Sequence, residues 1–312
     1  MISIIKPSCP VTQWQIPKSL QYNFTLDREQ IFLKVLQDIQ SPKFFPSNAT
    51  QQHKWESGWQ ENLEAFRLTQ EIDDLIPKYN FSERFQTWRH QGRYIQPVDP
   101  HFGIRVLEDL LSNLFARHGQ NAKHYYEIGA GSCYNLTYLA QDPVARKTTT
   151  FHALDWTATT SEIVTELNKL SLYASNPIQN GMFNLFDPFS RQLNLFPHMH
   201  NIVTSFEPES IILTCGALEQ IGEKWQAFLE FLFSQKEKIQ YVIHIEPFFE
   251  GYQNTLFDYI AAQYHQKRNY LRGYFPKLRE METKGEIEIL KFEKTIGTLM
   301  HDGWTQVVWR FC

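Results

Sequence analysis

A glycine-rich turn that follows an acidic residue is the stretch of this sequence best suited to hold a ligand. The run HYYEIGAGSCYNL contains Glu127, Gly129 and Gly131 between a short apolar segment and residues that favour a helix. The later stretch FHALDW ends in Asp155 and Trp156. Glycines let the backbone approach a ligand closely, and a carboxylate at the end of a strand can accept hydrogen bonds from both hydroxyls of a ribose. This pattern predicts a nucleotide-type cofactor site in which Trp156 covers an adenine.

Two classes of cofactor site use such a turn. A dinucleotide site requires G-x-G-x-x-G, whose third glycine lets the helix pack closely on the strand, and Tyr134 occupies that position here. What remains is an acid two residues before the first glycine, a second glycine, and an acid that closes the next strand. This pattern resembles the first two motifs of the class I S-adenosylmethionine-dependent methyltransferases, whose usual run is E/D-x-G-x-G-x-G. Cys133 stands at the third glycine of that run.

The resemblance implies S-adenosylmethionine as the cofactor, bound through Glu127, Gly129, Gly131 and Asp155. Glu127 would meet the methionine ammonium, directly or through water. The family often has an acid after the third strand that contacts the adenine amino group. The run FNLFDP offers either Asn184, through its carbonyl oxygen, or Asp187 for that contact.

The candidate catalytic residues are ionisable side chains near the ends of the fourth and fifth predicted strands: Glu219, Glu246 and His265. Methyl transfer depends mainly on alignment of the acceptor, the methyl group and the sulfur, and a base helps if the acceptor is a hydroxyl. Glu246 ends the strand IQYVIHIE, where partial burial would raise its pKa toward that of a general base; alternatively, it orders the loop or caps the next helix. His244 points to the same side of that strand and is interpreted as a core histidine.

The elements that position these residues alternate regularly from residue 96 onward. After a strand in the glycine-turn run, further strands are expected at 148–155, within 177–186, and at 210–216, 239–246, 286–294 and 306–311. Helices are expected at 102–118, 160–170, 224–234 and 256–272. The alternation predicts an α/β fold, a doubly wound and mostly parallel sheet. The resemblance implies seven strands with the last one antiparallel.

Residues 1–95 lie outside this alternation and are predicted to form an N-terminal helical cap, with residues 96–312 as the methyltransferase domain. Residues 27–39 have the spacing of an amphipathic helix, and Trp55 and Trp59 begin a second apolar stripe. The stripe either packs the cap onto the core or forms a lid over the pocket. Residues 84–94 gather three arginines and several aromatics, which indicates either a solvated linker helix or a contact to an anionic or ring-shaped substrate.

Composition limits the partners. The formal net charge is −4 and the pI is about 6.3, which argues against nucleic-acid binding because that requires a strongly basic face. Arg268 and Arg272 share one side of the predicted helix 256–272 with His265, and could hold a carboxylate or phosphate or form a solvated face.

The four cysteines show no C-x-x-C pair, which indicates reduced thiols and no metal site. With no long apolar run, we expect a cytoplasmic protein without a membrane segment.

The predicted activity is methyl transfer to a small-molecule acceptor at oxygen or nitrogen. The tetrapeptide N/D-P-P-Y/F of the nucleic-acid and glutamine-modifying branches is missing, as is the Pro-Cys nucleophile of cytosine-C5 enzymes. The tract HIEPFFEGYQNTLFDYIAAQYHQKRNYLRGY resembles bacterial methyltransferases associated with surface-sugar or secondary-metabolite pathways. Two alternatives remain: a non-catalytic binding or assembly protein on the same fold, and an NAD-dependent dehydrogenase.

Overall fold

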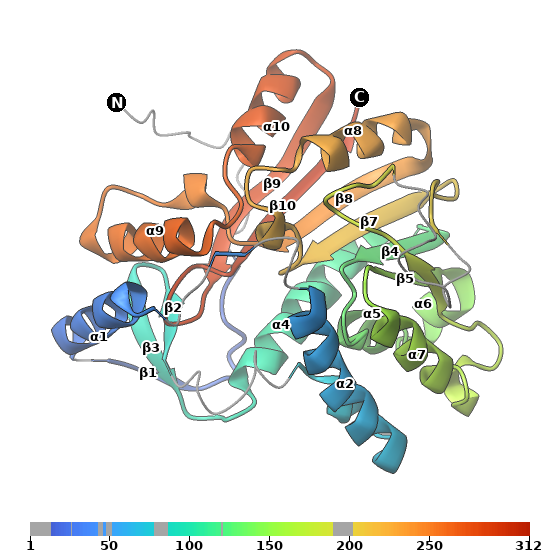
Figure 1. Ribbon diagram of the computed structural model, residues 1–312, viewed down its shortest axis with the longest axis horizontal. Helices are drawn as coiled ribbons and strands as arrows, with labels where there is room; N and C mark the ends of the chain where they lie inside the picture. Colours follow the sequence, from blue (N-terminus) through green and yellow to red (C-terminus); the bar gives the residue numbers. More distant parts are fainter. Residues whose placement is uncertain are drawn as a thin grey trace.

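The structure, a computed structural model, consists of two β-sheets with helices around them (Figure 1). It describes residues 14–25, 27–42, 46–47, 52–77, 87–119, 121–189 and 202–312. The larger sheet has seven strands: β4 (His124–Ile128), β5 (Thr150–Asp155), β6 (Gln179–Met182), β7 (Ser210–Cys215), β8 (Ile239–Glu246), β9 (Ile287–Ile296) and β10 (Trp304–Phe311). Each lies within or beside the range that the sequence predicts for it.

The strand order is β6-β5-β4-β7-β8-β10-β9. The pairs from β6 to β8 are parallel, and β10 is antiparallel to both of its neighbours. The mostly parallel sheet and its antiparallel last strand confirm the predicted class I methyltransferase fold. A dinucleotide-binding sheet has the order 3-2-1-4-5-6, whereas here an antiparallel strand is inserted before the edge strand. The chain changes direction across the sheet between β4 and β7, and ligands bind at such a switch point.

Helices cover both faces of this sheet because successive side chains of each strand point to opposite faces. Tyr125 of β4 lies in a core with α4, α5 and α7, whereas Tyr126 faces the core beneath α8 and α10 (Figure 1). These helices are α4 (Phe102–Leu114), α5 (Tyr134–Leu139), α7 (Ala158–Leu167), α8 (Gln226–Ser234) and α10 (Tyr274–Thr283), with α6 (Pro143–Thr148) on the α5 side. The two cores hold the sheet rigid, which fixes the loops at its carboxyl edge.

The predicted helix 256–272 is wrong at its carboxyl end. Helix α9 (Leu256–Arg268) stops at Asn269, whose φ of 52° places it in the left-handed region that ends many helices. Arg272 therefore lies outside the helix, where its guanidinium donates to Asn269 Oδ1 at 3.1 Å and faces Glu223 at 3.6 Å. His265, Arg268 and Arg272 do not share one helical face.

The N-terminal region contains strands as well as helices. Helices α1 (Arg28–Gln40) and α2 (Gln52–Thr69) match the two predicted apolar stripes. The predicted linker helix at 84–94 is wrong where the structure describes it, since β2 (Trp88–His90) and β3 (Arg93–Pro97) form a hairpin; residues 78–86 lie outside the described part. Gln91 and Gly92 both have positive φ, which matches the twist of a two-residue hairpin turn. With β1 (Tyr22–Phe24), the hairpin makes a three-stranded sheet.

Arg89 of β2 is buried and ties the hairpin to the rest of the chain. Its guanidinium donates to Asp302 Oδ1 (3.1 Å), Asp258 Oδ1 (3.0 Å) and the Phe257 carbonyl (3.0 Å), and lies 3.6 Å from the Phe257 ring centroid. Arg89 is therefore occupied within the protein and does not offer its charge to a substrate.

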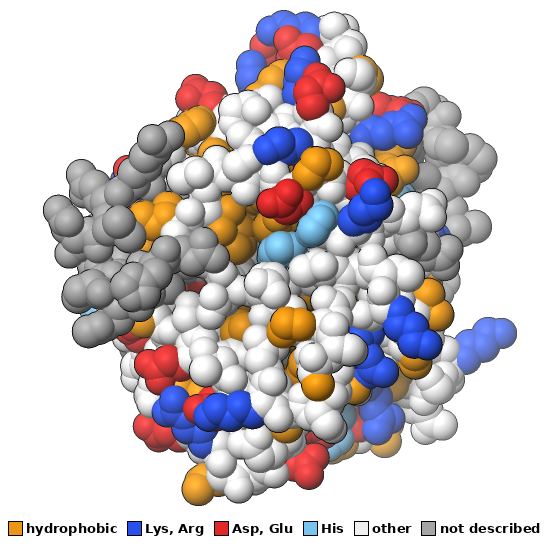
Figure 2. Space-filling view, turned by 90° about the vertical axis from the view of Figure 1, so that its right-hand side faces the viewer, with side chains coloured by type: hydrophobic (Ala, Val, Ile, Leu, Met, Phe, Trp, Pro, Cys, Tyr) orange, Lys and Arg blue, Asp and Glu red, His pale blue; other side chains and the backbone are white. Residues whose placement is uncertain are grey.

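The face of the molecule drawn in Figure 2 carries charges of both signs. On the face drawn in Figure 2, basic and acidic side chains are interspersed, and neither sign covers it continuously. Among the described helices, none combines the length and apolar character needed to cross a lipid bilayer.

Candidate functional site

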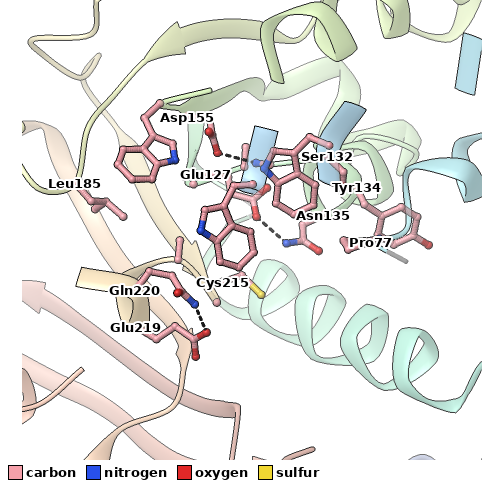
Figure 3. Close-up of a pocket in the computed structure, with 18 of the residues that line it drawn as sticks. Pro77, Glu127, Ser132, Tyr134, Asn135, Asp155, Leu185, Cys215, Glu219 and Gln220 are labelled. Atoms are coloured by element: carbon pink, nitrogen blue, oxygen red, sulfur yellow. Dashed lines mark hydrogen bonds between the residues drawn. The ribbon is translucent and has the colours of Figure 1, made fainter. Parts of the chain in front are cut away.

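A cavity lies at the carboxyl edge of the large sheet, over the ends of β4, β5, β6 and β7 (Figure 3). Its lining includes the glycine turn, Asp155, Trp156 and Glu219. Helix α2 contributes two tryptophans to it, the segment between β9 and β10 contributes Thr298, His301 and Gly303, and β10 contributes Trp304. Because β10 runs antiparallel to β8, this segment returns to the same edge of the sheet. The cavity is therefore built jointly by the predicted domain and the N-terminal cap.

Both glycines of the turn are required for two reasons: each has a positive φ, and a Cβ at either position would collide with a neighbouring residue. Gly129 has φ of 77°, and a Cβ built there would lie 2.3 Å from the Cβ of Ala217. Gly131 has φ of 52°, and a Cβ there would lie 2.5 Å from the ring of Trp59 on α2. Cys133, at the third glycine position of the motif, takes the left-handed conformation with φ of 63°. The turn thus keeps its glycine-like path, and Trp59 covers it closely.

Glu127 carries a buried carboxylate at the floor of the cavity. Asn135 Nδ2 donates to its Oε1 at 2.6 Å, while Oε2 is buried without a hydrogen-bond partner among the described residues. Burial raises the pKa of Glu127 to about 8 although the Asn135 hydrogen bond opposes the shift. A cationic group placed beside Oε2 would satisfy both the oxygen and the charge.

Asp155 ends β5 and is held by the glycine turn itself. The Gly131 amide donates to its Oδ2 (2.9 Å), and the Thr157 amide and hydroxyl donate to its Oδ1 (each 2.8 Å). Burial raises the pKa of Asp155 while these donors oppose the shift. Oδ2 accepts one of these bonds and keeps capacity for a ligand hydroxyl, so the carboxylate is fixed in place before a ligand binds.

The predicted adenine contacts differ in their placement. Trp156 lines the cavity, with its ring 5.6 Å from that of Phe186. Asn184 is not among the described lining residues; its Oδ1 accepts the Phe186 amide at 2.9 Å. Asp187 is exposed, and the described lining does not include it. Apolar side chains, including Phe183 and Phe186, form this wall instead.

The three candidate catalytic residues also separate. Glu219 lines the cavity, whereas Glu246 and His265 are fully buried and absent from its described lining. The Glu246 carboxylate accepts the backbone amides of Ala217 (3.0 Å), Leu218 (2.9 Å) and Glu219 (3.1 Å), and so anchors the loop after β7. The His265 Nε2 contacts the Leu271 carbonyl at 2.7 Å. Only Glu219 of the three reaches the space where an acceptor can bind.

Glu219 is oriented by a chain of hydrogen bonds. Gln220 Nε2 donates to Glu219 Oε1 (Figure 3), and Gln220 Oε1 accepts the Ser47 hydroxyl at 2.6 Å. Arg268 lies beyond Ser47, with a guanidinium nitrogen 3.4 Å from its hydroxyl. Burial and the neighbouring Glu246 raise the pKa of Glu219, and Arg268 opposes the shift. A raised pKa makes this carboxylate a stronger base than an exposed glutamate, which suits it to take up a proton from a ligand.

His301 is a lining residue that sequence reasoning missed. It is 8% exposed, packs beside the rings of Tyr264 (5.2 Å) and Tyr270 (5.6 Å), and its Nδ1 has no partner in the described chain. Burial and the neighbouring His265 lower the pKa of His301 to about 3, so the ring is neutral. One feature of the sequence could have indicated it: an antiparallel last strand places the loop before it at the carboxyl edge of the sheet, where the cavity lies.

His244 has the structural role that the sequence indicates. Its Nδ1 contacts the Thr214 hydroxyl at 2.9 Å, and its Nε2 accepts the Trp309 indole N–H at 3.1 Å. Both ring nitrogens are satisfied inside the core, so His244 is not a candidate for proton transfer.

Several solved methyltransferase structures are similar to the chain at low sequence identity. Magnesium protoporphyrin IX methyltransferase from Synechocystis PCC 6803 with bound S-adenosylhomocysteine has a TM-score of 0.44 and 12% identity, covering 67% of this chain and 83% of that one. A SAM dependent methyltransferase from Aquifex aeolicus has a TM-score of 0.42 and 13% identity, covering 65% and 89%. The CurJ carbon methyltransferase has a TM-score of 0.43 and 11% identity, covering 92% and 81%. No protein-family model and no curated protein matches the chain.

Proposed function

We propose that the protein binds S-adenosylmethionine and transfers its methyl group to a small-molecule acceptor, at oxygen or nitrogen. The observation that carries the proposal is Glu127 Oε2, a buried acceptor without a partner among the described residues at the floor of the cavity. The methionine ammonium of the cofactor supplies the missing donor and the missing positive charge. Asp155 lies on the next strand, where a ribose would be held.

The chain's own residues would bind and orient rather than form covalent bonds. Glu127 holds the ammonium, Asp155 the ribose, and Trp156 covers the adenine. The bound sulfonium supplies an activated methyl group. Glu219 takes up the proton of a hydroxyl acceptor, and Glu246 keeps the loop that carries Glu219 in position through three backbone amides. A role in surface-sugar or secondary-metabolite biosynthesis and a cytoplasmic location remain predictions.

Calorimetry with S-adenosylhomocysteine and, separately, with NADH tests the proposal. We expect the first ligand to bind and the second not to bind. Asp155→Ala should weaken S-adenosylhomocysteine binding by about 2 kcal/mol, roughly thirtyfold, because a charged hydrogen-bond acceptor is lost. Asp187→Asn is the matched control, since this exposed carboxyl follows the adenine wall without lining the cavity, and it should bind as the parent does. NADH binding in place of S-adenosylhomocysteine would favour a dehydrogenase instead.

A non-catalytic protein on this fold would bind S-adenosylhomocysteine as well, so turnover separates the two readings. Incubation with methyl-labelled S-adenosylmethionine and a set of small hydroxyl and amine acceptors should yield labelled product, and Glu219→Gln should abolish most of it. Binding without transfer to any acceptor would support the non-catalytic alternative.

A further inference from the structure

The lining of the cavity contains more aromatic side chains than contact with a single adenine requires. Four of the chain's eight tryptophans, Trp55, Trp59, Trp156 and Trp304, line it. They come from α2, from the end of β5 and from the start of β10. Trp55 and Trp59 are stacked, with ring centroids 6.1 Å apart and planes at 24°. Flat indole surfaces on several sides favour a planar ligand over a flexible chain.

The charges of the lining argue against a charged acceptor. No lysine or arginine is among the described residues that line the cavity, so an anionic acceptor would face Glu219 without a compensating cation in the wall. Arg268 is directed to Ser47 and Tyr270 instead. A cationic acceptor would lie beside the sulfonium of the cofactor that we propose, which repels it.

Outside the part of the lining that we assign to the cofactor, Glu219 and His301 can form hydrogen bonds with a ligand. The Gln220 amide fixes Glu219 Oε1, which leaves Glu219 Oε2 as the oxygen available to a ligand. His301 is neutral, and its Nδ1 has no partner in the described part of the chain. The Arg89 ion pairs hold Asp302, and therefore the segment that carries His301. A hydroxyl has one hydrogen to donate and an oxygen that accepts, so it can donate to Glu219 Oε2 while a His301 ring N–H donates to its oxygen.

We propose that the methyl acceptor is an uncharged planar molecule that carries a hydroxyl group, stacked between the tryptophans with its hydroxyl directed to Glu219 and His301. This inference rests on the proposed function. The acceptor O–H bond breaks as its proton passes to the Glu219 carboxylate, and the oxygen forms a bond to the methyl carbon. The C–S bond breaks with its electron pair left on sulfur, giving a methyl ether and S-adenosylhomocysteine, and Glu219 then returns the proton to water. His301 is a positioning residue that orients the hydroxyl.

Binding of matched naphthalene probes to the protein saturated with S-adenosylhomocysteine tests the proposal. The probes are naphthol, methoxynaphthalene, naphthoate and naphthylmethylammonium, and phenol serves as a smaller hydroxyl probe. We expect naphthol or phenol to bind at least tenfold more tightly than the anion, the cation and the methyl ether. Equal or tighter binding of the anion or cation overturns the proposal, as does failure of both hydroxyl probes to bind. If S-adenosylhomocysteine itself does not bind, the proposed function fails first.

Two variants assign the roles of the polar groups. His301→Phe keeps a ring beside Tyr264 and Tyr270 but has no ring N–H. It should bind naphthol and methoxynaphthalene more weakly than the parent does, while S-adenosylhomocysteine binds normally. Glu219→Gln should still bind the hydroxyl probe, and its kcat with that probe should fall at least a hundredfold with KM changed less than threefold. A His301→Phe protein that binds naphthol as tightly as the parent would remove His301 from the proposal.

Discussion

Two buried groups of charged side chains in this protein differ in their balance of positive and negative charge. The Arg89 cluster consists of Arg89, Asp258, Lys294 and Asp302; the Glu219 cluster consists of Glu219, Glu246 and Arg268. In the first, two positive charges balance two negative ones within 3.1 Å. In the second, two carboxyls share one partly buried guanidinium that touches neither of them directly.

The pKa shifts follow this difference. Burial by itself would raise the pKa of Asp302, but Arg89 and Lys294 outweigh it and lower the pKa to about 2. Burial raises the pKa of Glu219, and the adjacent Glu246 adds to the shift because two like charges resist ionising together. A balanced cluster holds the fold, whereas an unbalanced one beside a cavity can exchange a proton with a ligand. The structure uses the first to anchor the loop that completes the site.

The largest expected effect comes from breaking the balanced cluster. Arg89→Met leaves the Asp258 and Asp302 carboxylates buried with Lys294 as their remaining cation, and should lower the free energy of unfolding by about 3–5 kcal/mol. Urea denaturation at neutral pH measures it. Lys294→Met is the control, since Lys294 is partly exposed and its loss should cost less. A loss below about 1 kcal/mol for Arg89→Met would show that the cluster is not structural.

The next effect is at Glu127, a further unbalanced carboxyl. Its pKa of about 8 means that it holds a proton at pH 7, and a bound ammonium would expel it. Calorimetry of S-adenosylhomocysteine in buffers of different ionisation enthalpy should therefore show release of close to one proton. Glu127→Gln should bind about 2 kcal/mol more weakly and release none. Equal proton release from this variant would place the titrating group elsewhere.

A smaller effect concerns stability and pH. The pKa of Glu219 is raised in the folded state, so the folded protein holds the proton more tightly than the unfolded chain does. Its contribution to stability is present below the unfolded pKa of about 4.3 and is lost as pH rises toward the folded value. Glu219→Gln removes this titration, so its stability relative to the parent should increase as pH rises from 5 to 8. Urea midpoints at the two pH values measure the gain.

Asp302→Asn is the contrasting variant, because the folded pKa of Asp302 is lowered. The stability that Asp302 provides is present above its unfolded pKa of about 3.9 and is lost only as pH falls toward 2. The difference between Asp302→Asn and the parent should accordingly be constant from pH 5 to pH 8. A pH-dependent difference in that range for Asp302, or a constant one for Glu219, would reverse the distinction between the clusters.

The sequence predicts the sheet and the cofactor half of the cavity well because both are local in the chain. Glu127, Gly129 and Gly131 lie in one turn, and Asp155 ends the strand that pairs beside it. The central strands show apolar runs of their own, whereas the edge strand β6, with the sequence QNGM, is predicted only as part of the wider range 177–186. The hairpin at 88–97 was missed because its strands are short and its charged Arg89 is buried in ion pairs, which reverses the expected polarity.

The acceptor half could not be predicted in the same way. Trp59, Glu219 and His301 come from three segments that meet only after the sheet has formed and α2 has packed over the glycine turn. The sequence favours Glu246 as the base, possibly with His265, yet backbone amides occupy the Glu246 carboxylate and the Leu271 carbonyl contacts His265 Nε2. Side-chain direction at a strand end depends on tertiary packing that a one-dimensional pattern does not contain.

The smallest expected effect belongs to an exposed group of charges that also joins the cap to the domain. Arg67 of α2 reaches Glu162 (3.0 Å) and Glu166 (3.2 Å) of α7, with 42% of its side chain exposed. Water and salt screen such pairs, so Arg67→Ala should lower the free energy of unfolding by less than about 1 kcal/mol. Because Trp59 covers Gly131, α2 should stay in place and S-adenosylhomocysteine affinity should change less than threefold. Urea denaturation and calorimetry on this variant measure both; a loss above 2 kcal/mol, or a large drop in affinity, would mean that the exposed pairs, and not the tryptophans, hold α2 over the cavity.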